Sequence, residues 1–246
     1  MNVKPNSFGL THVGMRRSHN EDSIFLFDDI GLYIVADGMG GHAMGEVASA
    51  LAVKTISEEL FSSNQSNSNF SLVKAVKQAN NRIYQYSRER LESVGESGTL
   101  MAGMGTTVVA LFINKETVSI AHVGDSRVYR MRDSKFEVLT TDHSLVSLAA
   151  QNRGIPPIPI RTGFKNVITR ALGIEPDVEV DIREDKIIPN DLFLLCSDGL
   201  TNMVTDQRIE EILNSGISLQ TAGETLINEA NRNGGKDNIS CILVRC

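Results

Sequence analysis

The first part of the chain combines short apolar runs with longer segments of helical period. Residues 31–36 read Gly-Leu-Tyr-Ile-Val-Ala and lead into Asp37-Gly38, which is typical of a buried strand that ends in a turn. Apolar residues then recur at helical steps over 47–60 and again over 72–86. The pattern therefore predicts early strands followed by two amphipathic helices, which a Ser/Asn-rich connector joins.

Strand patterns return in the middle of the chain. Residues 106–113 and 117–123 are rich in β-branched and apolar residues and are separated by a short polar loop, so we expect an antiparallel hairpin. A second pair of strands is predicted over 127–131 and 135–140. Successive hairpins indicate a meander rather than a βαβ alternation, and they disfavour a Rossmann-type fold.

The last part of the chain opens with a segment that lacks a regular pattern. Residues 142–161 end in three closely spaced prolines, which remove amide donors and clash with a helix or a central strand. We therefore expect an irregular excursion there. After it, the pattern predicts two strands, two helices and a closing strand, over 178–188, 192–197, 209–213, 219–230 and 239–244.

Composition limits the class of protein. Of the 246 residues, 41% are hydrophobic and 22% are charged, which suffices for a buried core and excludes an intrinsically disordered chain. The formal net charge of −6 disfavours binding to nucleic acid or to an anionic membrane.

Cysteine usage and hydropathy indicate where the protein works. The three cysteines lack the spacing of a disulfide framework or a zinc knuckle, and an odd number fits a reducing compartment. The first ten residues contain no apolar run of signal-peptide length, and no uninterrupted apolar stretch of about 18 residues occurs in the sequence. We therefore expect a cytoplasmic protein with no membrane insertion.

Six acidic residues stand at the boundaries of the predicted strands. Two of them, Asp37 and Asp198, follow an apolar run and precede glycine, and the other four flank strands: Glu21, Asp22, Asp125 and Asp237. Taken singly, each is explained as a turn residue, because Asp-Gly is common in turns.

The joint pattern points to a metal centre. If the strand ends converge, the carboxylates repel one another unless cations lie between them. Oxygen ligands without a Cys/His set favour Mg²⁺ or Mn²⁺ over Zn²⁺.

Short motifs surround these acids along the chain. The first two are Gly-Met-Arg-Arg-Ser-His-Asn-Glu-Asp-Ser at 14–23 and Val-Ala-Asp-Gly-Met-Gly-Gly-His at 35–42. Others follow at 103–107, 122–127, 140–144, 167–173, 196–200 and 236–238. In sequence and in order, these motifs resemble those of bacterial metal-dependent Ser/Thr protein phosphatases of type 2C. The resemblance covers essentially the whole chain, which implies one phosphatase domain over residues 1–246.

The resemblance implies a fold and a dinuclear centre. The fold would be of the α+β class, an αββα sandwich of two antiparallel sheets flanked by helices, with the metal ions at the sheet edges. Asp37 would bridge two divalent cations, Mn²⁺ or Mg²⁺, and the Gly38 carbonyl would bind one of them. Asp198 and Asp237 would complete the shell of the first ion.

The same resemblance implies roles for the remaining acids and for an asparagine beside them. Glu21 or Asp22 would serve the second ion, directly or through water. Asp125, together with Asp198, corresponds to the weaker third metal site of the bacterial members. Asn238 would lie beside the ligands without binding an ion itself.

The implied reaction is hydrolysis of phosphoserine and phosphothreonine by a metal-bridging water or hydroxide, so no protein nucleophile is required. The catalytic candidates are Asp37 and Arg17, because Arg17 matches the arginine that holds the substrate phosphate and a guanidinium fork suits phosphate oxygens. In many eukaryotic relatives a histidine directly after the Asp-Gly pair is proposed as general acid, but that position is Met39 here. For His42, three residues later, an acid role and a packing role both stay open.

The chain departs from the family at a flap segment, about 142–165, where prolines replace the usual helical, acidic sequence. We expect this divergent flap to be a specificity element. The implied partners are phosphoprotein substrates and a cognate Ser/Thr kinase.

Two other classes of function compete with this reading. A phosphatase-like domain that only binds a partner would be expected to have lost residues such as Arg17 and Asp37, which are intact. A structural calcium-binding protein is disfavoured because no EF-hand spacing is present. His122 and His143 are interpreted as structural histidines rather than metal ligands.

Overall fold

The computed structural model describes residues 4–40, 44–62, 68–94, 103–151 and 167–246, and its strands form two antiparallel sheets. One sheet has the strand order β1 (Asn6–His12), β11 (Ile239–Arg245), β10 (Leu192–Cys196), β7 (Arg127–Arg132) and β8 (Lys135–Val138). The other has the order β2 (Asp22–Phe27), β3 (Leu32–Met39), β5 (Val108–Asn114), β6 (Thr117–Val123) and β9 (Asp181–Lys186), with the short β4 (Gly105–Thr106) paired to β3.

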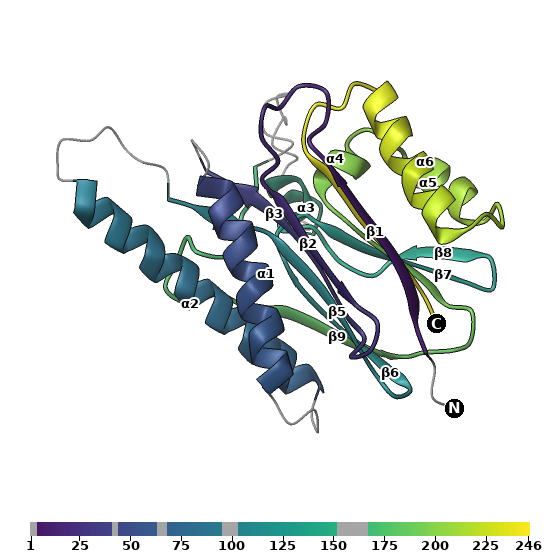
Figure 1. Ribbon diagram of the computed structural model, residues 1–246, viewed down its shortest axis with the longest axis horizontal. Coiled ribbons are helices and arrows are strands. Elements are labelled where there is room, and N and C mark those ends of the chain that lie inside the picture. Colours follow the sequence, from purple (N-terminus) through teal and green to yellow (C-terminus); the bar gives the residue numbers. More distant parts are fainter. Residues whose placement is uncertain (1–3, 41–43, 63–67, 95–102, 152–166) are drawn as a thin grey trace.

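Helices cover the outer face of each sheet (Figure 1). The sheet that contains β3 is covered by α1 (Met44–Ser62) and α2 (Ser68–Val94), and the sheet that contains β11 by α5 (Asp206–Leu213) and α6 (Leu219–Arg232). Two shorter helices, α3 (Leu145–Gln151) and α4 (Asp198–Thr201), follow β8 and β10. These layers confirm the αββα sandwich that the resemblance implies.

Apolar side chains fill the three spaces between the four layers. Alternation along β3 directs Leu32 and Ile34 toward α1 and α2, and Tyr33 and Val35 toward the other sheet. Because both faces of this strand are covered, it carries the continuous apolar run seen in the sequence.

Local signals explain where several elements begin. The α5 helix starts where Thr205 accepts the Arg208 amide, and α6 starts where Ser218 accepts the Thr221 amide, so each helix has a hydroxyl N-cap. The predicted hairpin over 106–123 is present as β5 and β6, and the pair over 127–140 as β7 and β8.

Some predicted elements need correction. The segment 142–161 is not irregular throughout, because α3 forms before the prolines and Ser144 accepts the Ser147 amide at 3.3 Å at its start. Residues 152–165 of the proposed flap lie outside the described residues. The strand predicted over 178–188 is shorter, since only β9 pairs with β6. Neither β1 nor α4 has a counterpart among the predicted elements, because one is half polar and the other is a single turn.

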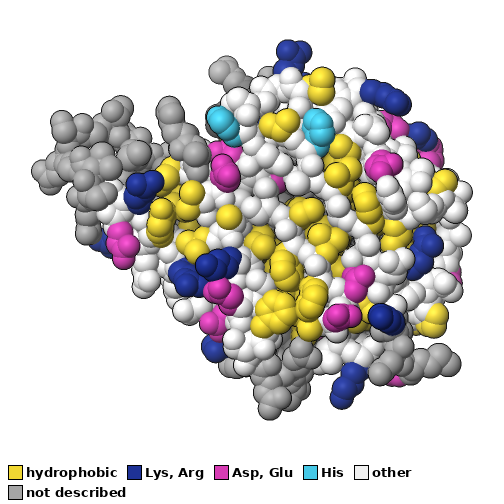
Figure 2. Space-filling model, viewed as in Figure 1, with side chains coloured by type: hydrophobic (Ala, Val, Ile, Leu, Met, Phe, Trp, Pro, Cys, Tyr) yellow, Lys and Arg dark blue, Asp and Glu magenta, His cyan; other side chains and the backbone are white. Residues whose placement is uncertain are grey.

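Hydrophobic side chains gather on the face shown in Figure 2, with charged residues of both signs around them. Phe27 on β2 and Phe61 on α1 are both exposed, and their ring centroids lie 5.6 Å apart. Within the described ranges, no helix combines the length and the apolar character needed to span a lipid bilayer.

Candidate metal centre

The centre begins where the β2-β3 hairpin reaches its open end. The antiparallel register places Asp22 opposite Asp37. Two threonines fix the Asp37 backbone, because the Asp37 amide donates to Thr107 Oγ1 at 3.1 Å and Thr106 Oγ1 donates to the Asp37 carbonyl at 2.9 Å. The peptide that joins Asp37 to Gly38 is therefore held in one orientation.

Gly38 stands where two backbone segments approach closely. A Cβ at this position would lie 2.1 Å from the Gly45 carbonyl oxygen and 2.6 Å from the Glu21 carbonyl oxygen. Gly45 in turn faces the Glu21 side chain, since a Cβ there would lie 2.9 Å from Glu21 Oε1. Glycine at both positions lets the start of α1 and the Glu21 carboxylate pack against the end of β3.

The other sheet contributes Asp198 and Asp237. Asp198 is the first residue of α4, two residues after the end of β10, and Asp237 lies just before β11. These two strands pair antiparallel with Cys196 opposite Cys241, so both acids lie at the same edge of the sheet. A Cβ on Gly199 would lie only 3.5 Å from the Asp237 Cβ, which shows that the two loops are in contact.

The acids from the two sheets repel one another. Burial raises the pKa of Asp37 well above its ordinary value, and repulsion from Asp22, Asp198, Asp125 and Asp237 raises it further. Burial also raises the pKa of Asp198, and repulsion by Asp237 adds to the effect, while a side-chain hydrogen bond with Asp37 opposes it. We call these five residues the acid cluster.

Asp22 connects the two sheets through its side chain. It is 7% exposed, and its Oδ2 accepts hydrogen bonds from Ser197 Oγ at 2.8 Å and from Ser240 Oγ at 2.6 Å. Burial nevertheless raises the pKa of Asp22 to about 7, because the two hydroxyls only partly offset the loss of water.

Asp125 lies in the loop between β6 and β7. It is 9% exposed, and burial, followed by repulsion from Asp198 and Asp142, raises its pKa to about 7. Asp125 therefore lies close enough to Asp198 for the two carboxylates to interact.

The acid cluster fits hard divalent cations. All of its side-chain donors are oxygen atoms, which Mg²⁺ and Mn²⁺ prefer. Two buried carboxylate oxygens, Asp22 Oδ1 and Asp125 Oδ1, have no hydrogen-bond partner among the described residues. Bound cations would neutralise the repulsion that raises these pKa values, so the cluster can hold a metal centre.

Arg17 and Glu21 lie at the edge of the cluster. Arg17 Nη2 donates to Asp237 Oδ2 at 2.8 Å, and the two side chains are 50% and 35% exposed. This hydrogen bond raises the pKa of Arg17. Burial raises the pKa of Glu21, and the charge of Arg17 opposes that shift. A partly exposed guanidinium thus stands next to the carboxylates.

Asn238 positions the loop that carries these two residues. Its Oδ1 accepts the Glu21 amide at 2.8 Å, and its Nδ2 donates to the Val13 carbonyl at 3.0 Å and the His19 carbonyl at 2.8 Å. It therefore lies beside the cluster as a structural bridge. His42, the remaining candidate, lies outside the described residues.

A second group of ionisable residues includes the two histidines interpreted above as structural. Three donor atoms, from His122, His143 and Asp181, all lie within 4.8 Å of one another. Among the described residues no other three His, Cys, Asp or Glu side chains are as close together, so the donor atoms of the acid cluster lie farther apart than these. The imidazoles of His122 and His143 stack with centroids 4.5 Å apart, and burial lowers the pKa of His122 to about 4.

Hydrogen bonding argues against a metal ion among these three residues. Both nitrogens of His143 already have neighbours, because Nδ1 accepts the Gly124 amide at 3.0 Å and Nε2 lies 3.1 Å from Arg170 Nη1 and 3.3 Å from Asp181 Oδ2. Arg170 also pairs with Asp181 at 2.6 Å, so a guanidinium supplies the positive charge at this group. These contacts favour a structural role for His143, whereas both ring nitrogens of His122 are buried without a hydrogen-bond partner among the described residues.

Sequence reasoning did not single out the side chains that hold the acids in place. Ser197 and Ser240 bind Asp22, and Asn202 Nδ2 donates to Asp198 Oδ2 at 3.0 Å. Only the position of Ser197 directly before Asp198 offers a local hint.

Comparisons with known proteins match nearly the whole of this chain. Residues 11–243 match the family described as Protein phosphatase 2C. The serine/threonine phosphatase stp of Listeria welshimeri is 39% identical over 244 residues, which cover 95% of this chain and 93% of the Listeria protein.

Solved structures agree with the sequence matches. The Mycobacterium tuberculosis serine/threonine phosphatase PstP/Ppp is similar with a TM-score of 0.87 at 30% identity, over 99% of each chain. The catalytic domain of PstP in complex with two manganese ions gives a TM-score of 0.85 at 30% identity, over 98% of this chain and 97% of that one. The αββα fold is therefore shared with metal-bound phosphatases.

The raised pKa values predict that metal affinity depends on pH. Because a cation must displace protons from carboxyls such as Asp22 and Asp125, we expect the affinity for Mn²⁺ to fall by roughly tenfold or more from about pH 8 to about pH 6. Isothermal titration calorimetry in buffers of different ionisation enthalpy measures both the affinity and the protons released. Asp22→Asn should flatten the pH dependence, whereas an affinity that is equal at both pH values would contradict this account.

Proposed function

This chain belongs to the protein phosphatase 2C family, and we propose that it hydrolyses phosphoserine and phosphothreonine in proteins in a metal-dependent reaction. The observation that carries the proposal is the convergence of acids from two sheets beside a partly exposed arginine. A phosphate dianion can approach such a cluster only when bound cations reverse the local charge.

The proposed ligands follow from the positions of the acid cluster. Asp37 would hold both ions, with the Gly38 carbonyl on one of them, and Asp198 and Asp237 would bind the other. The support for Gly38 is its place directly after Asp37 at the end of β3, where its amide donates to the Glu21 carbonyl at 3.1 Å and the residue pairs with Thr106 of β4. Two bound Mg²⁺ or Mn²⁺ ions supply an activated water and neutralise charge on the phosphoryl oxygens.

Glu21 and Asp22 differ in what they can contribute. Glu21 packs against the start of α1 beside Gly38, so it would serve the second ion directly or through a water. Asp22 has one oxygen occupied by two serine hydroxyls, which leaves Oδ1 to accept a hydrogen bond from an ion's water ligand.

We also assign a third, weaker cation to Asp125 together with Asp198. The repulsion between these two carboxylates supports the assignment. With fewer carboxylates than the dinuclear site, this site would bind its ion less tightly.

Arg17 would bind the substrate phosphate. One of its five N–H donors is used by Asp237, and the half-exposed side chain leaves other donors for phosphate oxygens. Because the contact with Asp237 fixes the guanidinium at the edge of the cluster, the phosphate would be held close to the ions.

The proposal extends to the cellular context. We propose that residues 1–246 form one domain, supported by the apolar core that the two sheets share. We further propose that the protein acts in the cytoplasm and opposes a Ser/Thr kinase. Cys196 and Cys241 stand opposite each other as free thiols, which suits a reducing compartment.

Removing the bridging carboxylate tests the proposed function. Asp37→Asn keeps the size of the side chain but removes its charge, so we expect Mn²⁺-dependent hydrolysis of p-nitrophenyl phosphate to fall at least about a hundredfold. Asp28→Asn is a matched control, because Asp28 lies beyond the opposite end of β2 and contacts Ser7 and Tyr33. Hydrolysis that survives both Asp37→Asn and a chelator would refute the proposal.

Replacement of Arg17 tests the phosphate site. Arg17→Ala should raise the KM for a phosphopeptide by about tenfold or more, because charged hydrogen bonds to the phosphate are lost. Arg17→Lys should recover only part of the loss, since an ammonium cannot make the forked contact. Arg16→Ala, in the same loop, is the control. Steady-state kinetics that give the same KM and kcat for Arg17→Ala as for the wild type would show that the phosphate binds elsewhere.

A further inference from the structure

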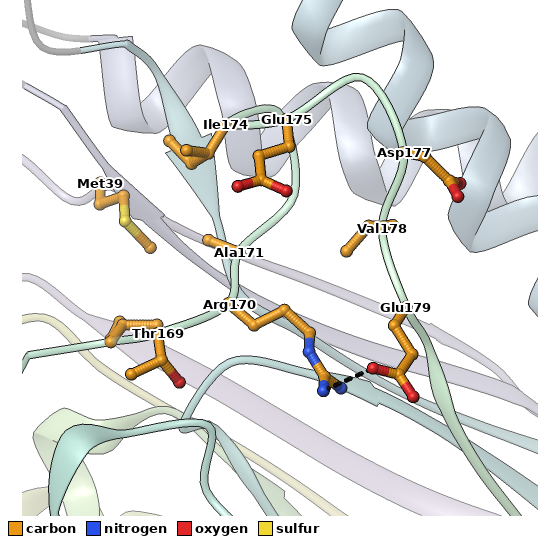
Figure 3. A pocket seen from close by; sticks show the side chains of 10 residues that line it. Met39, Thr169, Arg170, Ala171, Ile174, Glu175, Asp177, Val178 and Glu179 are labelled. Atoms are coloured by element: carbon orange, nitrogen blue, oxygen red, sulfur yellow. Dashed lines mark hydrogen bonds and ion pairs between the residues drawn. The ribbon is translucent and has the colours of Figure 1, made fainter. Parts of the chain in front are cut away.

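A pocket of about 460 Å³ opens beside the metal centre (Figure 3). Met39, the residue after Gly38, contributes one wall, and most of the rest comes from the segment 168–179 that leads into β9. The pocket is therefore continuous with the end of β3, where the proposed ligands Asp37 and Gly38 lie.

The segment that lines the pocket is fixed to its surroundings. Leu172 exchanges backbone hydrogen bonds with Thr106 in β4, at 3.1 Å and 2.9 Å. On the other side, Asn80 of α2 accepts the Gly173 amide at 2.8 Å and donates to the Glu175 carbonyl at 3.0 Å. The pocket is thus formed by the fold itself and needs no rearrangement to accept a ligand.

The pocket has an apolar floor next to the metal centre. A Cβ on Gly105 would lie 2.9 Å from Ile174 Cδ1, and Gly105 pairs with Met39 across β3 and β4. Ala171 and Val178 face the same space in Figure 3. An aliphatic chain that enters the pocket would therefore meet apolar side chains.

Among the described residues that line the pocket, the charged groups are paired, with one exception. Arg170 binds Glu179 at 2.9 Å and Asp181 at 2.6 Å, and Asp177 binds Lys77 at 3.1 Å. Glu175 is exposed and points its carboxylate over the pocket in Figure 3.

Glu175 is therefore the charge that a ligand can meet. Within the described residues, its side chain makes no ion pair or hydrogen bond, and only its carbonyl is used, by Asn80. An unpaired carboxylate above an apolar floor is complementary to a cation carried on an aliphatic stem.

We infer that this pocket binds a lysine or arginine side chain of the phosphoprotein substrate, a few residues from the phosphorylated serine or threonine. The inference rests on the proposed function, which places the phosphate at the acid cluster. An extended peptide advances about 3.3–3.6 Å per residue, so a neighbouring long side chain can reach a pocket that begins at Met39. Its methylenes contact Ile174 and Val178, and its cationic head contacts Glu175.

An acidic residue at the same place in the substrate is disfavoured by charge. It would meet Glu175, and the described residues that line the pocket offer no free cation to it, because Arg170 is engaged by Glu179 and Asp181. The pocket thus determines which sequences around a phosphorylated residue are preferred.

Phosphopeptides that differ at one position test the inference. A single arginine, glutamine or glutamate is moved along both sides of the phosphothreonine, and kcat/KM is measured with Mn²⁺ at low salt. We expect the wild type to prefer arginine over glutamine by about two- to fivefold at one or two positions, which is the range of an exposed ion pair. The preference should shrink when salt is added.

Two substitutions separate Glu175 from its acidic neighbours. Glu175→Gln should abolish the preference for arginine, and Glu175→Arg should favour glutamate instead. Asp177→Asn is the matched control and should keep the preference, because Asp177 also lines the pocket but is paired with Lys77.

The outcomes distinguish this inference from the proposed function. Glu175→Gln, Glu175→Arg and Asp177→Asn should all hydrolyse p-nitrophenyl phosphate at the wild-type rate, since that substrate has no side chain for the pocket. An arginine preference that is absent in the wild type, or that survives Glu175→Gln, overturns the inference even when p-nitrophenyl phosphate turnover is intact. Loss of p-nitrophenyl phosphate turnover in the wild type would refute the proposed function instead.

Discussion

Repulsion among buried carboxylates is the constraint on which this structure depends. Asp37 lies among four other aspartates. Two strands of each sheet bring four of the five acids together, the loop between β6 and β7 adds Asp125, and burial removes the water that would otherwise separate their charges. Without cations, such a cluster can persist only by holding protons, which is why the pKa values of Asp22 and Asp125 rise to about 7. The need for positive charge therefore explains the metal centre, the position of Arg17 and the attraction of a phosphate to an acidic chain.

The scaffold withstands this repulsion through hydrogen bonds between the two sheets. Asp22 belongs to one sheet and binds the hydroxyls of Ser197 and Ser240 from the other, while Asn238 bridges to the loop that carries Arg17 and Glu21. Some of these contacts join residues that are more than 200 positions apart in the sequence, such as Asp22 and Ser240. The proposed metal ligands and the packing of the sandwich are thus parts of one arrangement, so a change at either should alter both.

The sequence predicted the elements whose signals are local. The β3 strand was foreseen because an apolar run covered on both faces ends in Asp37-Gly38, and the hairpins were foreseen from alternating β-branched residues and short loops. The fold itself and the ligand assignments came from the resemblance, since spacing alone does not show that Asp37 and Asp198 meet. Ser197 and Ser240 have no local signal because their partner is remote in sequence. The α3 helix was not predicted because the prolines were taken to disrupt the whole of 142–161, whereas the helix ends at Gln151, before the first of them.

The pocket beside the acid cluster also depends on complementary charge between protein and substrate. Cations at the acid cluster would attract the phosphate, whereas the unpaired carboxylate of Glu175 would attract a basic residue beside it. Charges of opposite sign therefore select different parts of one substrate.

The most direct test of the account is anomalous diffraction from crystals grown with manganese. We predict two strong peaks that share a contact with the Asp37 carboxylate, one of them also touching the Gly38 carbonyl and the other touching Asp198 and Asp237. Peaks that leave Asp37 without a metal contact, or manganese bound only among His122, His143 and Asp181, would contradict it.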